Sequence, residues 1–217
     1  MMPPEKDSRS PFSRLAVLIS GRGSNLQAII DAIRDGRLAA TIAVVVSDRA
    51  DAAGLRRARD AGIEAIDVNP REYPDRDAYD HALAALLRAR AVDLVCLAGY
   101  MRLVRAPLLE AFPNRILNIH PSLLPAFPGL QAQRQALEHG VRVSGATVHL
   151  VTSALDNGPI VLQATVPLLD DDTVESLSAR ILVDEHRLYP EAIRIVLGGG
   201  WSVVGRRFIC RPAGRSS

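Results

Sequence analysis

The sequence predicts an α/β fold: a mainly parallel sheet covered by helices on both faces, followed by an antiparallel C-terminal extension. Two observations carry this prediction. Over the first half of the chain, short apolar runs alternate with stretches of helical periodicity, which is the pattern of a parallel sheet whose strands are buried on both faces. Farther along, residues 143–152 and 160–166 alternate polar and apolar side chains closely enough to form an antiparallel pair.

Length and composition limit the class of protein. The chain has 217 residues, a length at which one domain is the default, and we expect one domain over 14–210 with flexible tails at 1–13 and 211–217. The net charge of +2 is too small to indicate a nucleic-acid partner. No apolar run is long enough to span a bilayer, and the polar N-terminus has no secretory signal. Cys96 and Cys210 lack CxxC spacing, which fits a reducing, cytoplasmic location.

The pattern of apolar residues places the elements of the first half. The expected strands are short apolar runs at 14–19, 41–47, 64–68 and 92–98. The expected helices span 26–35, 52–61 and 75–90, and the first two end at Gly36 and Gly62.

The second half is expected to begin with a short helix at 106–111 and a strand at 115–119. A helix over 130–138 precedes the antiparallel pair. Residues 173–197 read either as one long helix or as two helices interrupted near Pro190. A terminal hairpin is expected over 201–209.

A glycine loop, SGRGSN at 20–25, joins the first expected strand to the first expected helix. Converging backbone N–H groups and the helix dipole make such a junction an anion site. Gly21 and Gly23 match the start of GxGxxG, but the third position is Leu26, and no GK[ST] follows. The loop therefore favours one phosphate group over a dinucleotide. A tight turn with Ser24 as a helix cap is the alternative.

Polar side chains gather at the carboxyl ends of the expected strands. The glycine loop, residues 99–102, and the pair Asn118 and His120 all lie at such ends. Ligands of parallel sheets bind along this edge, so we expect the three segments to form one site.

Asn118 and His120 are two residues apart on a strand, so their side chains point the same way. An amide can donate to a developing oxyanion, and an imidazole can move a proton near neutral pH. Asp156 is the best candidate to keep His120 protonated, although it could simply shape its turn. No nucleophile elbow is present, and a metal is not expected because metal-ligand spacing is absent among His81, His139, His149 and His186. This trio favours direct acyl transfer between two substrates.

Five sequence blocks over 15–197 resemble the phosphoribosylglycinamide formyltransferase family, also called glycinamide ribonucleotide transformylases. In order, the blocks are LISGRGSNLQAII, LAGYMRLV, LNIHPSLLPAFPGL, VHLVTSALDNGPIVLQ and DEHRLYP. The resemblance implies a Rossmann-like formyltransferase fold. It also implies that the formyl group of 10-formyltetrahydrofolate passes to the amine of glycinamide ribonucleotide, in de novo purine biosynthesis.

The resemblance also assigns roles to residues of this chain. The catalytic residues would be Asn118, His120 and Asp156. Gly23, Ser24 and Asn25 would hold the ribonucleotide phosphate, which agrees with the anion site inferred from the loop. Glu185 would bind the ribose hydroxyls, and its alternative is a solvated helix charge.

The folate would be bound mainly by the segment after the fourth expected strand, which would clasp the pterin through backbone groups. The full set implied for the folate is Arg76, Met101, Arg102, Leu103, Val104, Asn118, Thr152 and Asp156. For Arg76, a surface charge at a helix start is the alternative.

The chain departs from the family pattern at Gln131, Gln133, Ser144 and Leu182. These differences bear on affinity and pH profile more than on reaction class. Three other functions are weighed: a 10-formyltetrahydrofolate hydrolase, a methionyl-tRNA formyltransferase and a non-catalytic nucleotide-binding module. The short N-terminal tail argues against the hydrolase, and the absence of a tRNA-binding extension argues against the methionyl-tRNA formyltransferase. The intact trio argues against the non-catalytic module. We expect small-molecule substrates, no nucleic-acid or membrane partner, and a monomer or homodimer.

Overall fold

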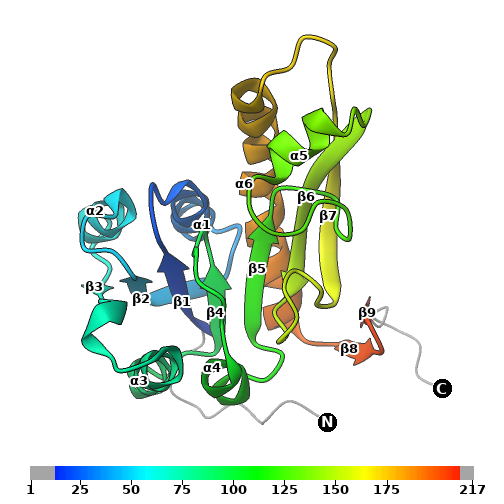
Figure 1. Cartoon of the computed structure of the whole chain (residues 1–217). Helices are drawn as coiled ribbons and strands as arrows, with labels where there is room; N and C mark the ends of the chain where they lie inside the picture. Colours follow the sequence, from blue (N-terminus) through cyan, green and yellow to red (C-terminus); the bar gives the residue numbers. More distant parts are fainter. Residues whose placement is uncertain (1–12, 211–217) are drawn as a thin grey trace, which may run out of the picture.

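A computed structural model describes residues 13–210 (Figure 1). Five parallel strands form its first half in the order β3-β2-β1-β4-β5. The strands are β1 (Ser13–Ile19), β2 (Ala40–Ser47), β3 (Ala65–Asp67), β4 (Leu94–Leu97) and β5 (Ile116–His120). The helices between them are α1 (Ser24–Arg34), α2 (Ala53–Asp60), the 3-10 turn η1 (Pro70–Glu72), α3 (Arg76–Ala89) and α4 (Ala106–Ala111).

The second half extends the same sheet with mainly antiparallel pairs, in the order β5-β6-β7-β9-β8. Its elements are α5 (Ala132–Glu138), β6 (Val143–Leu150), β7 (Ile160–Pro167), α6 (Val174–Gly198), β8 (Trp201–Val204) and β9 (Arg207–Cys210). The predicted fold class, with its parallel sheet and antiparallel extension, is confirmed.

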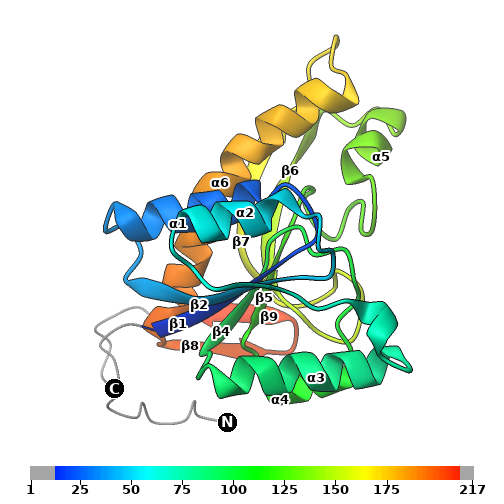
Figure 2. The same cartoon turned by 90° about the vertical axis from the view of Figure 1, so that its left-hand side faces the viewer.

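Helices cover both faces of the sheet, as Figure 2 shows with α1, α2 and α6 on one side and α3 and α4 on the other. Side chains of a strand alternate between faces. In β1, Val17 and Ile19 therefore pack with α1, α2 and α6, whereas Ala16 and Leu18 pack with α3 and α4. All four are fully buried. This double burial explains why the strands read as continuous apolar runs.

One alternative left open by the sequence is decided, and two further elements differ from their sequence-based expectations. Residues 174–198 form one helix although Pro190 lies inside it, so the two-helix alternative is wrong. A proline costs a helix about 3 kcal/mol, and burial of the surrounding turn against the sheet offsets that. The neighbouring Tyr189 is fully buried and its hydroxyl donates to the Leu97 and Leu117 carbonyls.

The helix expected from residue 130 begins at Ala132, because Gln131 has a left-handed backbone with φ 59°. Strand β3 is shorter than expected and only half-buried, as befits an edge strand.

The expected tails, 1–13 and 211–217, lie outside the described residues except for Ser13, which begins β1. Among residues 13–210, no helix combines the length and the apolar character needed to cross a membrane.

Candidate active site

The segments that follow β1 and β4 are tied together at the carboxyl edge of the sheet. The Ser20 amide donates to the Gly99 carbonyl at 3.1 Å, and the Met101 amide donates to Ser20 Oγ at 2.9 Å. A cavity of about 660 Å³ opens beside them. Its lining includes the glycine loop 21–25, Met101, Ile119 and Pro121 next to the β5 end, and Ser178, Leu182 and Glu185 of α6. The glycine loop, the segment that follows β4 (residues 99–104, the β4 loop) and the end of β5 thus border one cavity.

The glycine loop enters α1 through a left-handed residue, Gly23 at φ 73°. Ser24 is the first residue of the helix, and no side chain caps this end, so the Ser24-cap alternative is wrong. The first-turn N–H groups of a helix have no intrahelical partner. They are left free for an anion on the cavity side.

Asn25 and Glu185 join α1 to α6 at the cavity wall. Asn25 Nδ2 donates to Glu185 Oε2 at 2.7 Å, and both residues are only 7% exposed. Glu185 is therefore not a solvated helix charge. Burial raises the pKa of the Glu185 carboxyl, and the Asn25 bond partly opposes that rise. Asn25 Oδ1 is buried and has no hydrogen-bond partner among the described residues.

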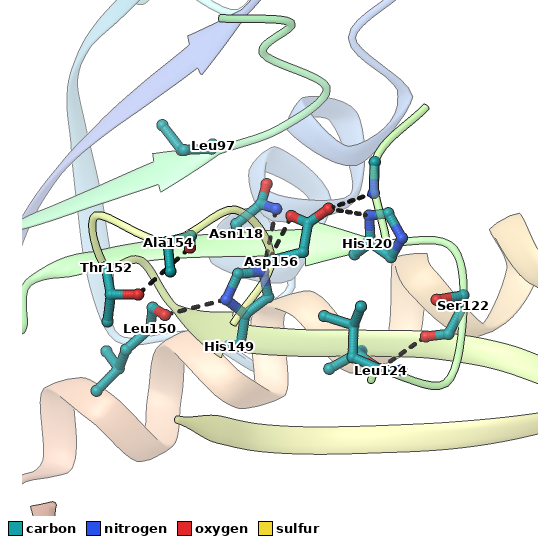
Figure 3. A network of polar contacts seen from close by, with 12 residues as sticks. Leu97, Asn118, His120, Ser122, Leu124, His149, Leu150, Thr152, Ala154 and Asp156 are labelled. Carbon is teal, nitrogen blue, oxygen red and sulfur yellow. Dashed lines mark hydrogen bonds and ion pairs between the residues drawn. The ribbon is translucent and has the colours of Figure 1, made fainter. Parts of the chain in front are cut away.

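Asn118 is held by a histidine of the neighbouring strand (Figure 3). β5 and β6 pair antiparallel with Asn118 opposite His149, which puts the two side chains on one face. Asn118 Nδ2 donates to His149 Nε2 at 3.2 Å, while His149 Nδ1 donates to the Leu150 carbonyl at 3.0 Å. Burial lowers the pKa of His149, which favours the neutral ring that this pattern requires. One hydrogen of the Asn118 amide remains uncommitted.

Asp156, on the loop between β6 and β7, lies between the two histidines (Figure 3). Its Oδ2 is 3.4 Å from His120 Nδ1 and accepts the Gly129 amide at 2.8 Å. Its Oδ1 is 3.7 Å from His149 Nε2. The His120 and Asp156 side chains are 6% and 8% exposed, so their pairing is screened little by solvent.

His120 is also fixed from its other side. Nε2 donates to the Phe127 carbonyl at 2.8 Å, so both ring nitrogens face oxygen acceptors. An imidazolium, which carries hydrogen on both nitrogens, matches this arrangement. The proline loop that supplies Phe127 is anchored in turn by Thr147 of β6, whose Oγ1 donates to Ser122 O and accepts from Leu124 N.

The residues implied for folate lie in several places. Met101 and Leu103 are 65% and 57% exposed, an unusual degree for apolar side chains beside a cavity, and Val104 is buried. The Arg102 guanidinium lies 5.1 Å from the centre of the Tyr79 ring. Thr152 is exposed on the loop that carries Asp156.

Arg76 begins α3 and is exposed. Within residues 13–210 it makes no hydrogen bond or ion pair to the β4 loop. Its surface-charge alternative therefore stays open.

His149 joins the site without having been expected there from the sequence, and Gly158 packs beside its backbone partner. A Cβ on Gly158 would lie 1.7 Å from the Leu150 carbonyl, the group that accepts from His149.

The four departures from the family pattern fall in different surroundings. Gln133 and Leu182 line the cavity, and Gln131 is exposed. Ser144 is buried, and its Oγ has no hydrogen-bond partner in the described part of the chain.

Comparisons with known proteins agree on one family. The formyl transferase family model matches residues 13–193. The phosphoribosylglycinamide formyltransferase of Escherichia coli (strain K12) is 46% identical over 82% of this chain and 84% of its own length. That of Bacillus subtilis (strain 168) is 41% identical over 86% of this chain and 96% of its own length.

A longer relative and a solved structure complete the comparison. The trifunctional purine biosynthetic protein adenosine-3 of Drosophila melanogaster is 47% identical over 86% of this chain, which spans only 14% of that protein. Glycinamide ribonucleotide transformylase 1 of Symbiobacterium toebii superposes with a TM-score of 0.90 at 63% identity, covering 94% of this chain and 97% of that one. The chain belongs to the formyl transferase family.

Proposed function

We propose that this chain transfers the formyl group of 10-formyltetrahydrofolate to the amine of glycinamide ribonucleotide, N1-(5-phospho-D-ribosyl)glycinamide, in purine biosynthesis. The observation that carries the proposal is the buried cluster of Asn118, His149, Asp156 and His120 at the end of β5, beside a cavity bordered by an anion-binding loop. The names of the relatives that match along most of their length support the same reaction.

The ribonucleotide would occupy the cavity with its phosphate on the glycine loop. The amides of Gly23, Ser24 and Asn25 are suited to the phosphate oxygens, because they lie at a helix start with free N–H groups. Glu185 would accept hydrogen bonds from the ribose hydroxyls.

10-Formyltetrahydrofolate would act as co-substrate on the other side of Asn118. The β4 loop offers the apolar Met101 and Leu103 together with backbone groups for the pterin, with Arg102 and Val104 completing the segment. Thr152 and Asp156 would form the opposite wall, and Arg76 would approach the folate from the start of α3, which lies at the same edge of the sheet.

In the proposed mechanism, the substrate amine attacks the formyl carbon directly and the protein handles the resulting charge. The uncommitted Nδ2 hydrogen of Asn118 donates to the tetrahedral oxyanion. His120, whose Nδ1 lies 3.4 Å from Asp156 Oδ2, would stabilise the oxyanion in its charged form. As the bond between the formyl carbon and the folate nitrogen breaks, His120, or a water that Asp156 relays through, gives a proton to the departing nitrogen. The attacking amine gives up one proton to that water or to the neutral His120, which restores the starting state. Since His120 Nε2 is engaged with the Phe127 carbonyl, its donation requires that bond to open or Nδ1 to serve.

The remaining expectations belong to the same proposal. We propose one formyltransferase domain over 14–210, supported by the continuous sheet of the described residues. The reaction as drawn uses no metal and no nucleic acid. A cytoplasmic location is supported by the two unpaired thiols, Cys96 and Cys210, and a monomer or homodimer would suffice because one chain supplies the whole cluster.

The test is an assay of tetrahydrofolate release from 10-formyltetrahydrofolate, with and without glycinamide ribonucleotide. Release that requires the ribonucleotide, with one formylated product per folate, is expected. Equal release without it would replace the proposal with a hydrolase. Binding of both ligands without release would make the chain a binding module.

A further inference from the structure

α2 packs against the glycine loop but supplies no residue to the lining of the 660 Å³ cavity. α1 and α2 lie side by side on one face of the sheet (Figure 2). Two groups of α2 reach the loop. The Gly54 amide donates to the Gly21 carbonyl at 3.0 Å, and Arg57 Nε donates to the Arg22 carbonyl at 2.9 Å. Gly54 and Arg57 are three residues apart, so they share one face of α2.

These bonds orient the peptides that face the ligand. In a trans peptide the C=O and the N–H point in opposite directions. A Gly21 carbonyl drawn toward α2 therefore turns the Arg22 N–H away from α2, and the Arg22 carbonyl does the same for the Gly23 N–H. Residues 21–25 line the cavity, so the N–H groups turned away from α2 face the space where the anion would bind.

A charged donor on the carbonyl also strengthens the N–H of the same peptide. Hydrogen bonds along a chain polarise one another, and a guanidinium donor is stronger than a neutral one. Arg57 thus makes the Gly23 N–H a better donor to a phosphate without touching the phosphate itself. Its second donor, Nη1, lies 3.4 Å from Gln27 Oε1, which helps to fix the guanidinium beside α1.

Close packing explains why α2 carries a glycine at residue 54. A Cβ there would lie 2.4 Å from Ile19 Cδ1 and 3.3 Å from the Gly21 carbonyl oxygen. A Cβ on Gly23 would in turn lie 2.7 Å from the Gly54 Cα. The loop and the first turn of α2 approach so closely that only a glycine pair fits between them.

We propose that Gly54 and Arg57 are positioning residues of the phosphate site, which hold the glycine loop in its anion-binding shape from the side opposite the ligand. This inference rests on the proposed function for the identity of the natural ligand. It does not depend on the catalytic step.

The experiment compares Arg57→Ala, Arg57→Lys and Gly54→Ala with the wild type and with Arg56→Ala as a matched control. Arg56 is the exposed neighbour of Arg57 and makes no hydrogen bond to the loop within residues 13–210. Two readouts are used: the KM values of both substrates with kcat, and calorimetric binding of ribose 5-phosphate as a simple phosphate ester.

For Arg57→Ala we expect the ribonucleotide KM and the ribose 5-phosphate Kd to rise roughly tenfold, the value of one charge-assisted hydrogen bond. The folate KM and kcat should not change, since Arg57 lies away from the β5 cluster. Arg57→Lys should recover part of the affinity, because its ammonium can donate to the Arg22 carbonyl. Gly54→Ala should weaken phosphate binding at least as much, and if it fails to fold, the Arg57 variants carry the test.

Unchanged ribonucleotide KM and ribose 5-phosphate Kd in Arg57→Ala would overturn the inference. So would equal losses in kcat and both KM values, which would indicate a merely structural role, or a wild type that does not bind ribose 5-phosphate. A wild type that binds ribose 5-phosphate but shows no ribonucleotide-dependent transfer would refute the proposed function and leave this inference standing.

Discussion

Asn118 has two amide hydrogens, and the fold commits only one of them. His149 takes one through Nε2, so the other has a fixed direction when a substrate arrives. A donor that is oriented before the reaction needs no reorganisation as the oxyanion forms. His149 is itself oriented by the Leu150 carbonyl, and together these bonds make the amide a preorganised donor.

Replacing the oxyanion donor and the proton carrier should reduce turnover. We expect Asn118→Ala to lower kcat by roughly 10²–10³. His120→Ala should lower kcat by roughly 10²–10⁴. Steady-state kinetics at saturating substrates measure both effects. His81→Ala, an exposed histidine on α3, is the control and should behave as wild type. Near wild-type turnover in both site variants would refute the mechanism.

Replacing Glu185 should have opposite effects on the stability of the protein and on its affinity for the ribonucleotide. Its pKa is raised by burial above the ordinary value of 4.5, so the folded state holds the proton more tightly than the unfolded chain does. The resulting stabilisation is complete below pH 4.5 and is lost as the pH rises through the raised pKa. Above pH 4.5 the wild type therefore loses this proton-linked stabilisation, a loss that a glutamine, which does not titrate, would not have.

We expect Glu185→Gln to increase the free energy of unfolding at pH 7 relative to the wild type, with the difference vanishing below the ordinary pKa. Urea titrations from below pH 4.5 up to pH 7 measure this difference in the free energy of unfolding. The ribonucleotide KM should rise about tenfold, because the glutamine amide has one acceptor oxygen where the carboxyl group has two. Glu191→Gln on the same helix is the control with the opposite sign, because Arg194 lowers the pKa of Glu191. A less stable Glu185→Gln at pH 7 would contradict the argument.

At the scale of elements, the site depends on the β6–β7 connection as much as on β5. This loop carries Asp156 in a left-handed conformation, with φ 47°. It returns to the sheet at Gly158, against the Leu150 carbonyl. The Leu150 amide then donates to Pro159 O at 2.9 Å. The β6–β7 loop thus packs against and hydrogen-bonds to Leu150, the residue whose carbonyl orients His149.

We expect Gly158→Ala to lower kcat and to change both KM values less. A Cβ would displace the Leu150 carbonyl, and His149 would lose the hydrogen bond that fixes its orientation and tautomer. The expected loss is on the order of tenfold, similar to one misoriented hydrogen bond. Gly198→Ala, at the C-terminal end of α6, has no neighbour within 4 Å of its Cβ and controls for glycine replacement as such. Equal kcat in the two variants would show that the loop does not orient His149.

The limits of sequence-based prediction are also clearest at this scale. Apolar runs predicted the five parallel strands, most clearly the central ones, because burial on both faces leaves a continuous signal. The antiparallel pair of β6 and β7 was predicted from alternating polar and apolar residues instead. Pro190 could be judged only from its surroundings, since a helix tolerates a proline when packing offsets the lost bond. His149 could not be given a role, because that role needs the register of β5 against β6 together with the backbone carbonyl beside it. Gly54 was equally hidden, because its partner loop lies in another βα unit.

At the scale of the whole molecule, one sheet links the two halves of the site. The anion loop follows β1 and the reactive cluster lies on β5 and β6, with β4 between β1 and β5. In the proposed function, the spacing between the ribonucleotide phosphate and its reacting amine would be matched to the spacing of these strands. Opening the sheet at β4 would separate the two halves of the site.

Cys96 in β4 reports on that opening. Its side chain is fully buried at the centre of the sheet, and burial raises the pKa of its thiol, whereas Cys210 is exposed. A thiol reagent acts on the exposed thiolate, so Cys96 can react only when the sheet opens. We expect one thiol per chain to react rapidly in native buffer and two in denaturing urea.

With Cys210→Ser, the remaining reaction should be slower than that of a free thiol by roughly 10³ or more, the inverse of the unfolded fraction at typical stability. Its rate should rise with urea in parallel with global unfolding followed by circular dichroism. A rate independent of urea would mean that the β1–β4–β5 region opens locally. In that case the two halves of the site would not be held by one rigid sheet, and ribonucleotide binding should slow the Cys96 reaction by closing that local opening.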